Sequence, residues 1–249
     1  KTTVETHRKN MPFCMGTLYW QLNDCWPAIS WSSLDYFGNW KALHYEAKRF
    51  FNPLFLTISE KGNNIEVFII NDQDKSIKAT LKLILYDFEN NLIKKKSLNL
   101  TIQPLSSEPV MFLDKKIFLE DLSDSEVFLH TFVECGLSKI SKNNYYFLDQ
   151  KYLKITKPKF DYNIDTSNNR ISIRVYAHSF IQQLHFISLN GQGFFSDNYV
   201  DMCKGDEIVI FFDQNNDCNS EPKDLMFEIR TLYDLTEGSE PIKASVRGQ

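Results

Sequence analysis

Residues 79–86 read Ala-Thr-Leu-Lys-Leu-Ile-Leu-Tyr, a stretch in which polar and apolar side chains alternate. In an extended chain the three leucines fall on one face, and Thr80 and Lys82 fall on the other. An alternation with a period of two residues is typical of a β-strand that has one buried face and one face in water. This stretch therefore predicts a strand of an antiparallel sheet.

Further stretches of this kind lie on both sides of it, and polar turns separate them. In the first series we expect strands at residues 65–70, 92–102, 126–134 and 144–148, and in the second series at residues 171–176, 183–189, 207–212 and 226–233. Between the two series, residues 151–159 are basic and contain Pro158. Short strands at regular spacing are typical of antiparallel sandwiches, which have about 100 residues each. The sequence therefore predicts two immunoglobulin-like β-sandwiches, at residues 53–157 and 158–249.

The composition of the chain changes near residue 52. All four tryptophans lie before it, at Trp20, Trp26, Trp31 and Trp40. The almost fully apolar residues 15–22 predict a strand that is buried on both faces. Residues 40–51 carry apolar side chains at i, i+3, i+4 and i+7, which predicts an amphipathic helix. A strand and a helix joined by a loop form a βα unit, which cannot bury its own apolar faces and needs neighbours outside this chain.

Composition and charge exclude several classes of protein. The chain has 249 residues, of which 43% are hydrophobic and 24% are charged, and its net charge is −4. These values are typical of a globular protein and argue against a disordered chain or a broad nucleic-acid surface. No apolar run approaches the roughly 20 residues that cross a membrane. The five cysteines are scattered without a C-x-x-C pair, and the histidines lack partners at metal-ligand spacing, so we expect neither a metal nor another cofactor.

The densest cluster of candidate binding residues is the stretch 19–26, Tyr-Trp-Gln-Leu-Asn-Asp-Cys-Trp. It lies at the carboxyl end of the predicted strand, where α/β barrels place their active sites. The flat faces of Trp20 and Trp26 suit the apolar face of a sugar ring, and the side chains of Asn23 and Asp24 suit its hydroxyl groups. A packed aromatic core is the alternative, because tryptophans are usually well buried; Asn23 and Asp24 then only cap the loop. The residues alone leave both interpretations open.

A longer pattern surrounds this cluster. It comprises residues 15–24 and, after them, Trp26-Pro27, Ser30-Trp31-Ser32-Ser33, Asp35-Tyr36, Asn39-Trp40-Lys41, Leu43-His44-Tyr45 and Lys48-Arg49-Phe50-Phe51. The pattern resembles the end of the catalytic barrel of the β-mannosidases of glycoside hydrolase family 2. Weaker resemblances to the later domains of that family lie at residues 143–148 and 195–198. The resemblance is strong up to residue 53 and loose after it.

The resemblance implies a mainly β chain in which the last βα unit of a TIM barrel, residues 1–52, precedes the two sandwiches. It implies the C-terminal part of a retaining exo-β-mannosidase, which hydrolyses terminal β-D-mannosyl residues. Such an enzyme needs two carboxyl groups roughly 5–5.5 Å apart. The family places both of them before this stretch. The carboxylates before residue 53 are Glu5, Asp24, Asp35 and Glu46. None of them is expected to be catalytic, and the chain alone is expected to be inactive.

By the same resemblance, Trp20 lines the subsite that holds the terminal mannose, and Asn23, Asp24 and Trp26 belong to the same motif. The implied partners are a mannose-terminated oligosaccharide or glycan and the remainder of the same enzyme, with no nucleic acid and no membrane. The polar residues 1–10 and the absence of an initial Met suggest a piece of a longer chain. A lysosome or a bacterial periplasm suits such an enzyme. Two alternatives remain: another family 2 enzyme, such as a β-galactosidase or β-glucuronidase, and a non-catalytic β-sandwich that binds sugar.

Three other features have simpler interpretations. Asn99-Leu100-Thr101 is a glycosylation sequon, which can carry a glycan if the protein is secreted in a eukaryote. Residues 94–96 are three lysines, which are typical of a solvated edge strand. Residues 213–219 follow the ligand spacing of a calcium loop, but Cys218 stands where that loop needs glycine, so we expect a polar hairpin loop.

Overall fold

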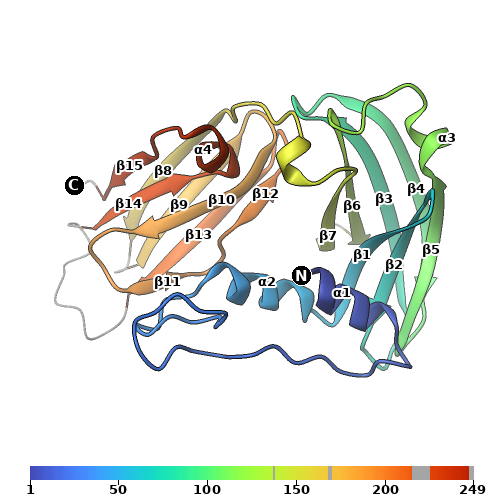
Figure 1. Ribbon diagram of the computed structural model, residues 1–249, viewed down its shortest axis with the longest axis horizontal. Helices are drawn as coiled ribbons and strands as arrows, with labels where there is room; N and C mark the ends of the chain where they lie inside the picture. Colours follow the sequence, from blue (N-terminus) through green and yellow to red (C-terminus); the bar gives the residue numbers. More distant parts are fainter. Residues whose placement is uncertain (137, 168–169, 215–224, 247–249) are drawn as a thin grey trace. The chain divides into compact units, whose positions relative to one another are not determined.

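The structure is a computed structural model that describes residues 1–136, 138–167, 170–214 and 225–246. The chain divides into two compact units, whose elements are labelled in Figure 1. The first unit comprises Lys1–Leu18 and Glu46–Ile155, and the second comprises Tyr19–Tyr45 and Thr156–Gln249. Most of residues 213–219, where the sequence predicts a polar hairpin loop, lie outside the described residues.

The first unit is a sandwich of two antiparallel sheets. One sheet has the order β1 (Leu54–Lys61), β2 (Asn64–Asn71), β5 (Ser106–Asp114), and the other has the order β4 (Leu92–Ile102), β3 (Ile77–Asp87), β6 (Val127–Cys135), β7 (Ser138–Tyr146). One hydrophobic core joins the sheets, because Leu81 and Leu83 of β3 belong to the same buried cluster as Leu56 and Val67 of the other sheet. Short elements follow the strands: helix α3 (Lys115–Leu119) and the 3-10 turn η1 (Gln150–Tyr152). The strand predicted at residues 79–86 is therefore confirmed as β3.

Helix α1 (Thr2–Lys9) belongs to the first unit and is held there mainly by polar contacts. Arg8 Nη2 lies 2.7 Å from Asp72 Oδ2, and Asn143 Nδ2 donates to Glu5 Oε1 at 3.0 Å. Val4 is the one residue of the helix that is buried. A helix without an apolar stripe gives no periodic signal in the sequence, which explains why we did not expect it.

The second unit is also a sandwich of two antiparallel sheets. One sheet has the order β12 (Val200–Met202), β10 (Ile181–Ser188), β14 (Met226–Arg230), β15 (Ile242–Ser245), and the other has the order β11 (Gly193–Phe195), β13 (Glu207–Gln214), β9 (Arg170–Ala177), β8 (Phe160–Ser167). Its core contains Ile173 of β9, Phe186 of β10 and Phe227 of β14. Tyr45, which lies far from these strands in the sequence, belongs to the same buried cluster.

The strand expected at residues 226–233 is shorter in the structure, because β14 ends at Arg230 and helix α4 (Leu232–Glu237) follows. Thr231 and Asp234 form a capping box, in which the backbone N–H of Thr231 donates to Asp234 Oδ2 at 2.8 Å. A Thr followed three residues later by an acidic side chain satisfies the free N–H groups at the start of a helix. This local signal overrides the β-propensity of the last residues of the stretch.

The segment between α1 and α2 (Ala42–Phe50) departs most from expectation. Residues 15–22 form no strand, and in residues 10–41 only isolated bridges join Asn23 to Leu34 and Leu34 to Trp40. Leu18 is 99% exposed. A barrel strand needs a hydrogen-bonded neighbour on each side. Among residues 15–22, only Gln21 and Leu22 form backbone hydrogen bonds within the described part of the chain, on one side, with Ser33 and Leu34. The predicted strand is therefore wrong for this chain. The mainly β fold with two antiparallel sandwiches is confirmed, and the TIM-barrel unit is not.

Candidate functional site

The predicted binding residues lie in one segment, residues 19–45 of the second unit. Trp20 is 74% exposed and Trp26 is 67% exposed, and Asn23 is exposed as well. Asp24, in contrast, is buried. The segment therefore presents two aromatic faces and one amide to solvent and withdraws the carboxylate. The alternative that these tryptophans form a packed core does not hold for Trp20 and Trp26 in this chain.

Asp24 is held by a network of charged and hydroxyl groups. Lys41 Nζ lies 2.7 Å from Asp24 Oδ2 and 2.7 Å from Ser32 Oγ. Ser30 Oγ donates to Asp24 Oδ1, and Ser32 Oγ donates to the carbonyl of Leu34 at 2.7 Å. The bonds from Lys41 and Ser30 lower the pKa of Asp24 to about 2. At neutral pH the carboxylate is therefore charged, and both of its oxygens are bound by side chains of its own chain.

Backbone hydrogen bonds close the loop that carries the exposed tryptophans. The N–H of Leu34 donates to the carbonyl of Leu22 at 2.8 Å, and the N–H of Asp24 donates to the carbonyl of Leu34 at 3.2 Å. Trp26 and Trp31 lie on the loop between these two bonded ends, and Trp31 is also exposed. The loop is thus fixed at its base by backbone bonds and by the Asp24–Lys41 pair.

His44 of helix α2 is hydrogen-bonded to the same segment. Ser33 Oγ lies 3.1 Å from His44 Nδ1 and 3.0 Å from the carbonyl oxygen of Leu22, and Tyr19 Oη lies 3.2 Å from Ser33 Oγ. Burial lowers the pKa of His44, so the imidazole is neutral at pH 7. The histidine acts here as a hydrogen-bonded packing group.

Two aromatic residues join the segment to the C-terminal sandwich within the second unit. The rings of Trp40 and Phe194 stack with centroids 4.8 Å apart and planes 6° apart. The N–H of Phe195 donates to Tyr45 Oη at 3.2 Å, and burial raises the pKa of Tyr45 to about 12. The sandwich therefore supplies the rigid base on which residues 19–45 rest.

The other carboxylates before residue 53 also have structural partners. Asp35 Oδ1 accepts from the N–H of Asn39 at 2.8 Å, and Glu46 pairs with Arg49 at 2.7 Å. Glu5 accepts from the side chain of Asn143, as described above. Each of these groups thus stabilises a turn or helix of this chain.

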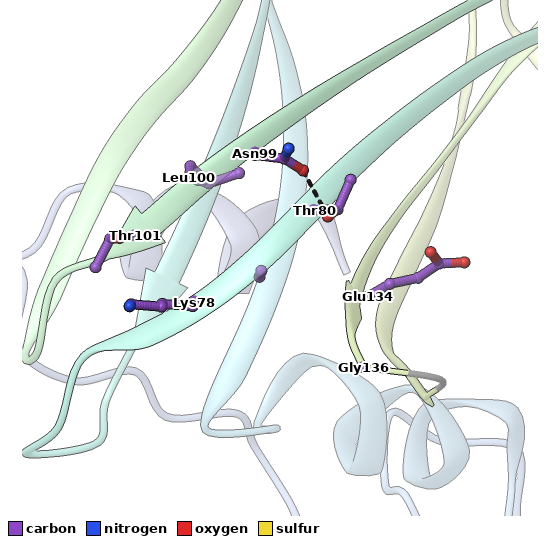
Figure 2. Close-up of a pocket in the computed structure, with 8 residues that line it drawn as sticks. Lys78, Thr80, Asn99, Leu100, Thr101, Glu134 and Gly136 are labelled. Atoms are coloured by element: carbon purple, nitrogen blue, oxygen red, sulfur yellow. Dashed lines mark hydrogen bonds between the residues drawn. The ribbon is translucent and has the colours of Figure 1, made fainter.

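The remaining surface offers few other sites. Over the ranges described, no group of three or more His, Cys, Asp and Glu side chains is arranged to hold a metal ion. No helix in those ranges combines the length and the apolar character that a membrane span needs. A shallow hollow of about 470 Å³ lies in the first unit, at the ends of β3, β4 and β6 (Figure 2). It contains none of the predicted binding residues.

Two family models match successive parts of the chain. A Mannosidase Ig/CBM-like domain matches residues 63–152, and an Ig-fold domain matches residues 155–235. The curated β-mannosidase of Rattus norvegicus is 31% identical over 234 residues, which cover 89% of this chain and 26% of the rat protein. That of Bos taurus is 70% identical over 61 residues, which cover 22% of this chain and 7% of the bovine protein. The chain is therefore similar to part of the curated β-mannosidases, and it contains the two domains that these models describe.

Solved structures share the fold of this chain. The β-D-mannosidase of Dictyoglomus thermophilum matches with a TM-score of 0.75 and 22% identity, over 99% of this chain and 28% of that one. An exo-chitosanase of Amycolatopsis orientalis matches with a TM-score of 0.73 and 14% identity, over 97% of this chain and 32% of that one. The chain spans about a quarter of the length of the rat relative. Since enzymes with different names share this fold, the fold alone does not define the sugar.

Two structural features of this segment were not predicted from the sequence. The first is the contact of Asp24 with Lys41 and its serine partners. All of these residues lie in the pattern that carries the resemblance, but their spacing in the sequence does not predict that they are in contact. The contact of Tyr45 with Phe195 joins residues from opposite ends of the chain. The apolar stripe of residues 40–51 predicted that the helix needs neighbours outside this chain, whereas Trp40 stacks on Phe194 of the same chain.

Proposed function

We propose that this chain is the C-terminal part of a retaining exo-β-mannosidase, in which residues 1–52 form the last βα unit of the TIM barrel. The observation that carries the proposal is the exposure of Trp20 and Trp26 on a segment whose base is fixed by the Asp24–Lys41 pair. Large apolar side chains gathered on a surface mark binding sites or interfaces. The similarity to curated β-mannosidases supports a sugar as the ligand of these aromatic faces.

Within this proposal each residue of the segment has a role that its surroundings permit. Trp20 packs against the apolar face of the terminal mannose, and Trp26 lines the same subsite. Asn23 offers its exposed amide to a sugar hydroxyl, since an amide both donates and accepts. Asp24 belongs to the same motif and acts through the loop that it holds, because both of its oxygens are already bound.

The hydrolysis itself requires groups outside this chain. A retaining glycosidase uses one carboxylate as nucleophile and a second as acid and base, about 5–5.5 Å apart. The carboxylates before residue 53 are engaged in structural bonds. The proposal therefore places both catalytic groups in the remainder of the enzyme, and the chain alone has no hydrolytic activity.

Exposed apolar side chains among the first 31 residues support the remainder of the enzyme as a partner. Phe13, Leu18 and Ile29 are almost fully exposed. Isolated βα units cannot cover their own apolar faces, and large exposed apolar patches are uncommon on monomeric proteins. In the proposed enzyme the neighbouring strands and helices of the barrel cover these side chains, and residues 15–22 become a strand when those neighbours are present.

Hydrolysis of aryl glycosides tests the proposal. The longest polypeptide that carries this sequence and the 249-residue chain are assayed with aryl β-D-mannoside, β-D-galactoside and β-D-glucuronide. We expect the long form to hydrolyse the mannoside and the short form to hydrolyse nothing. Hydrolysis of another glycoside alone would assign the protein to a different family 2 activity. Absence of hydrolysis by both forms would leave a sugar-binding or structural module.

The variant Trp20→Ala in the long polypeptide tests the role of the aromatic face. We expect a higher KM for the mannoside with an unchanged melting temperature, because the side chain is exposed in the chain and contacts the sugar in the enzyme. Lys48→Ala, at an exposed position of α2, is the matched control. Equal KM values for the two variants would remove Trp20 from the subsite.

A further inference from the structure

The sequence contains a single Asn-x-Ser/Thr sequon, Asn99-Leu100-Thr101, and the structure places it in strand β4. Side chains of a strand alternate between its two faces, so Asn99 and Thr101 share one face. Both are exposed, whereas Leu100 packs against the core of the first unit. The two residues that define the sequon therefore face solvent together.

The side-chain amide of Asn99 is oriented so that its nitrogen, Nδ2, can be modified. Thr80 Oγ1 donates to Asn99 Oδ1 at 2.8 Å, and Figure 2 shows the amide nitrogen directed away from Thr80. Over the described part of the chain, Asn99 Nδ2 has no hydrogen-bond partner. Beside it lies the hollow of about 470 Å³, which is lined by Lys78, Glu134 and neighbouring residues. The folded chain thus has room for a group attached to Asn99 Nδ2.

Strand β4 is also the outermost strand of its sheet, in the order β4-β3-β6-β7. The edge of a sheet presents unpaired backbone groups and invites pairing with another chain unless charges, prolines or a covering group protect it. Residues 94–96 are lysines and protect the first half of β4. Residues 97–102, Ser-Leu-Asn-Leu-Thr-Ile, have no charge, proline or glycine, which is the composition of an aggregation-prone segment. Leu98 is 38% exposed there.

We propose that Asn99 carries an N-linked glycan, which covers the uncharged half of the β4 edge. In the transfer, Asn99 Nδ2 attacks C1 of the first sugar of a lipid-pyrophosphate-linked oligosaccharide. The N–C1 bond forms, the bond between C1 and the pyrophosphate oxygen breaks, and the amide proton passes to a base of the transferase. The modification requires a secretory pathway that supplies this donor.

Peptide mapping tests the modification. The complete polypeptide that carries this sequence is expressed from its own reading frame in mammalian cells, and its peptides are analysed by mass spectrometry before and after peptide N-glycosidase. We expect the peptide with residue 99 to carry a hexose-rich glycan and to contain Asp at this position after release. The matched variants are Thr101→Ser, which keeps the sequon, and Thr101→Ala, which abolishes it. An unmodified Asn99 in wild type and Thr101→Ser would overturn the proposal.

A second comparison tests the function of the glycan at the edge. Asn99→Gln removes the attachment point, and Asn99→Lys replaces the glycan by a charge of the kind that protects residues 94–96. We expect a loss of soluble, monomeric protein for Asn99→Gln in size-exclusion chromatography and its recovery for Asn99→Lys. Equal monomer yields for wild type and Asn99→Gln would show that the glycan does not protect the edge.

Discussion

Trp20 and Trp40 lie in the same segment of the second unit but in opposite surroundings. Trp40 stacks on Phe194 and packs against the core of the C-terminal sandwich, whereas Trp20 stands open to solvent. The partner of Trp40 is supplied by a strand of this chain. The partners that the proposed barrel would give to Trp20 lie outside it. The two ends of the segment therefore differ in role. Residues 40–45 pack on the sandwich and contribute to stability, and in the proposed enzyme residues 19–31 contact a partner or ligand.

The largest expected effect is at the anchor. Tyr45→Ala removes a buried ring and leaves the N–H of Phe195 without its acceptor. We expect a loss of about 3–5 kcal/mol in the free energy of unfolding of the C-terminal sandwich, as for other large-to-small core substitutions. Tyr45→Phe keeps the ring and should lose only about 1–3 kcal/mol, the cost of an unsatisfied buried donor. Urea denaturation measures both; an unfolding midpoint of Tyr45→Ala equal to that of wild type would break the comparison.

A smaller effect on stability is expected from the carboxylate of Asp24. The pKa of Asp24 is lowered to about 2, so the unfolded chain binds its proton at a higher pH than the folded chain does. Its stabilising contribution is therefore complete above the pKa of an unfolded Asp, about 4, and is lost as the pH falls toward 2. As the pH falls from about 4 to 2, the free energy of unfolding should decrease more for wild type than for Asp24→Asn. Urea unfolding followed by tryptophan fluorescence measures this difference.

The control for this measurement is Asp74→Asn, because Asp74 is an exposed carboxylate of the first unit. Asp74→Asn should follow the wild-type pH dependence. If Asp24→Asn also followed it, the ion pair with Lys41 would not stabilise the folded segment.

A third effect concerns a histidine of the C-terminal sandwich. The ring of His185 stacks on Tyr199 with centroids 4.9 Å apart, and burial lowers the pKa of His185. The unfolded chain takes up the proton near pH 6.5, before the folded chain does, so stability is present above that pH and declines below it. We expect the melting temperature of wild type to fall between pH 7 and pH 5 more steeply than that of His185→Phe. Parallel slopes would assign the acid sensitivity to other groups.

The smallest expected effect is at the presented surface. Trp26→Ala in the 249-residue chain should change the free energy of unfolding by less than about 0.5 kcal/mol, as substitutions of exposed side chains usually do. In the long polypeptide the same variant should lower kcat/KM for an aryl β-D-mannoside. A large loss of stability in the short chain would mean that Trp26 belongs to the anchor after all.

Local pattern predicted those strands of the sandwiches that carry their own signal, but it missed others, among them β1 and β8. The stretch at 92–102 coincides with β4, and the stretch at 207–212 lies within β13. Strand β5 gave no such signal, since its two faces are similar in polarity and Pro109 lies beside the irregularity in its register with β2. A strand of this kind is fixed by its neighbour more than by its own alternation. The division at residues 1–52, 53–157 and 158–249 stays a prediction.

The candidate site was predictable in composition but not in arrangement. The cluster of aromatic and polar residues at 19–26 was recognisable as a candidate site, but it left open whether Trp20 and Trp26 are exposed or packed in a core. The burial of Asp24 was not predictable, because its partner Lys41 lies 17 positions later in an irregular segment. Side-chain pairs across a loop have no fixed spacing, unlike the pairs on a helix or strand. The direct role of these residues in sugar binding stays a prediction as well.

The division of helix α2 between Tyr45 and Glu46 has a consequence for modularity. Residue 53, just before β1, looks like a domain boundary. A gene fusion or deletion that cuts there removes Tyr45, whose ring is part of the core of the C-terminal sandwich. We therefore expect an engineered exchange of the C-terminal sandwich to keep its core intact only if residues 40–45 move with residues 156–246.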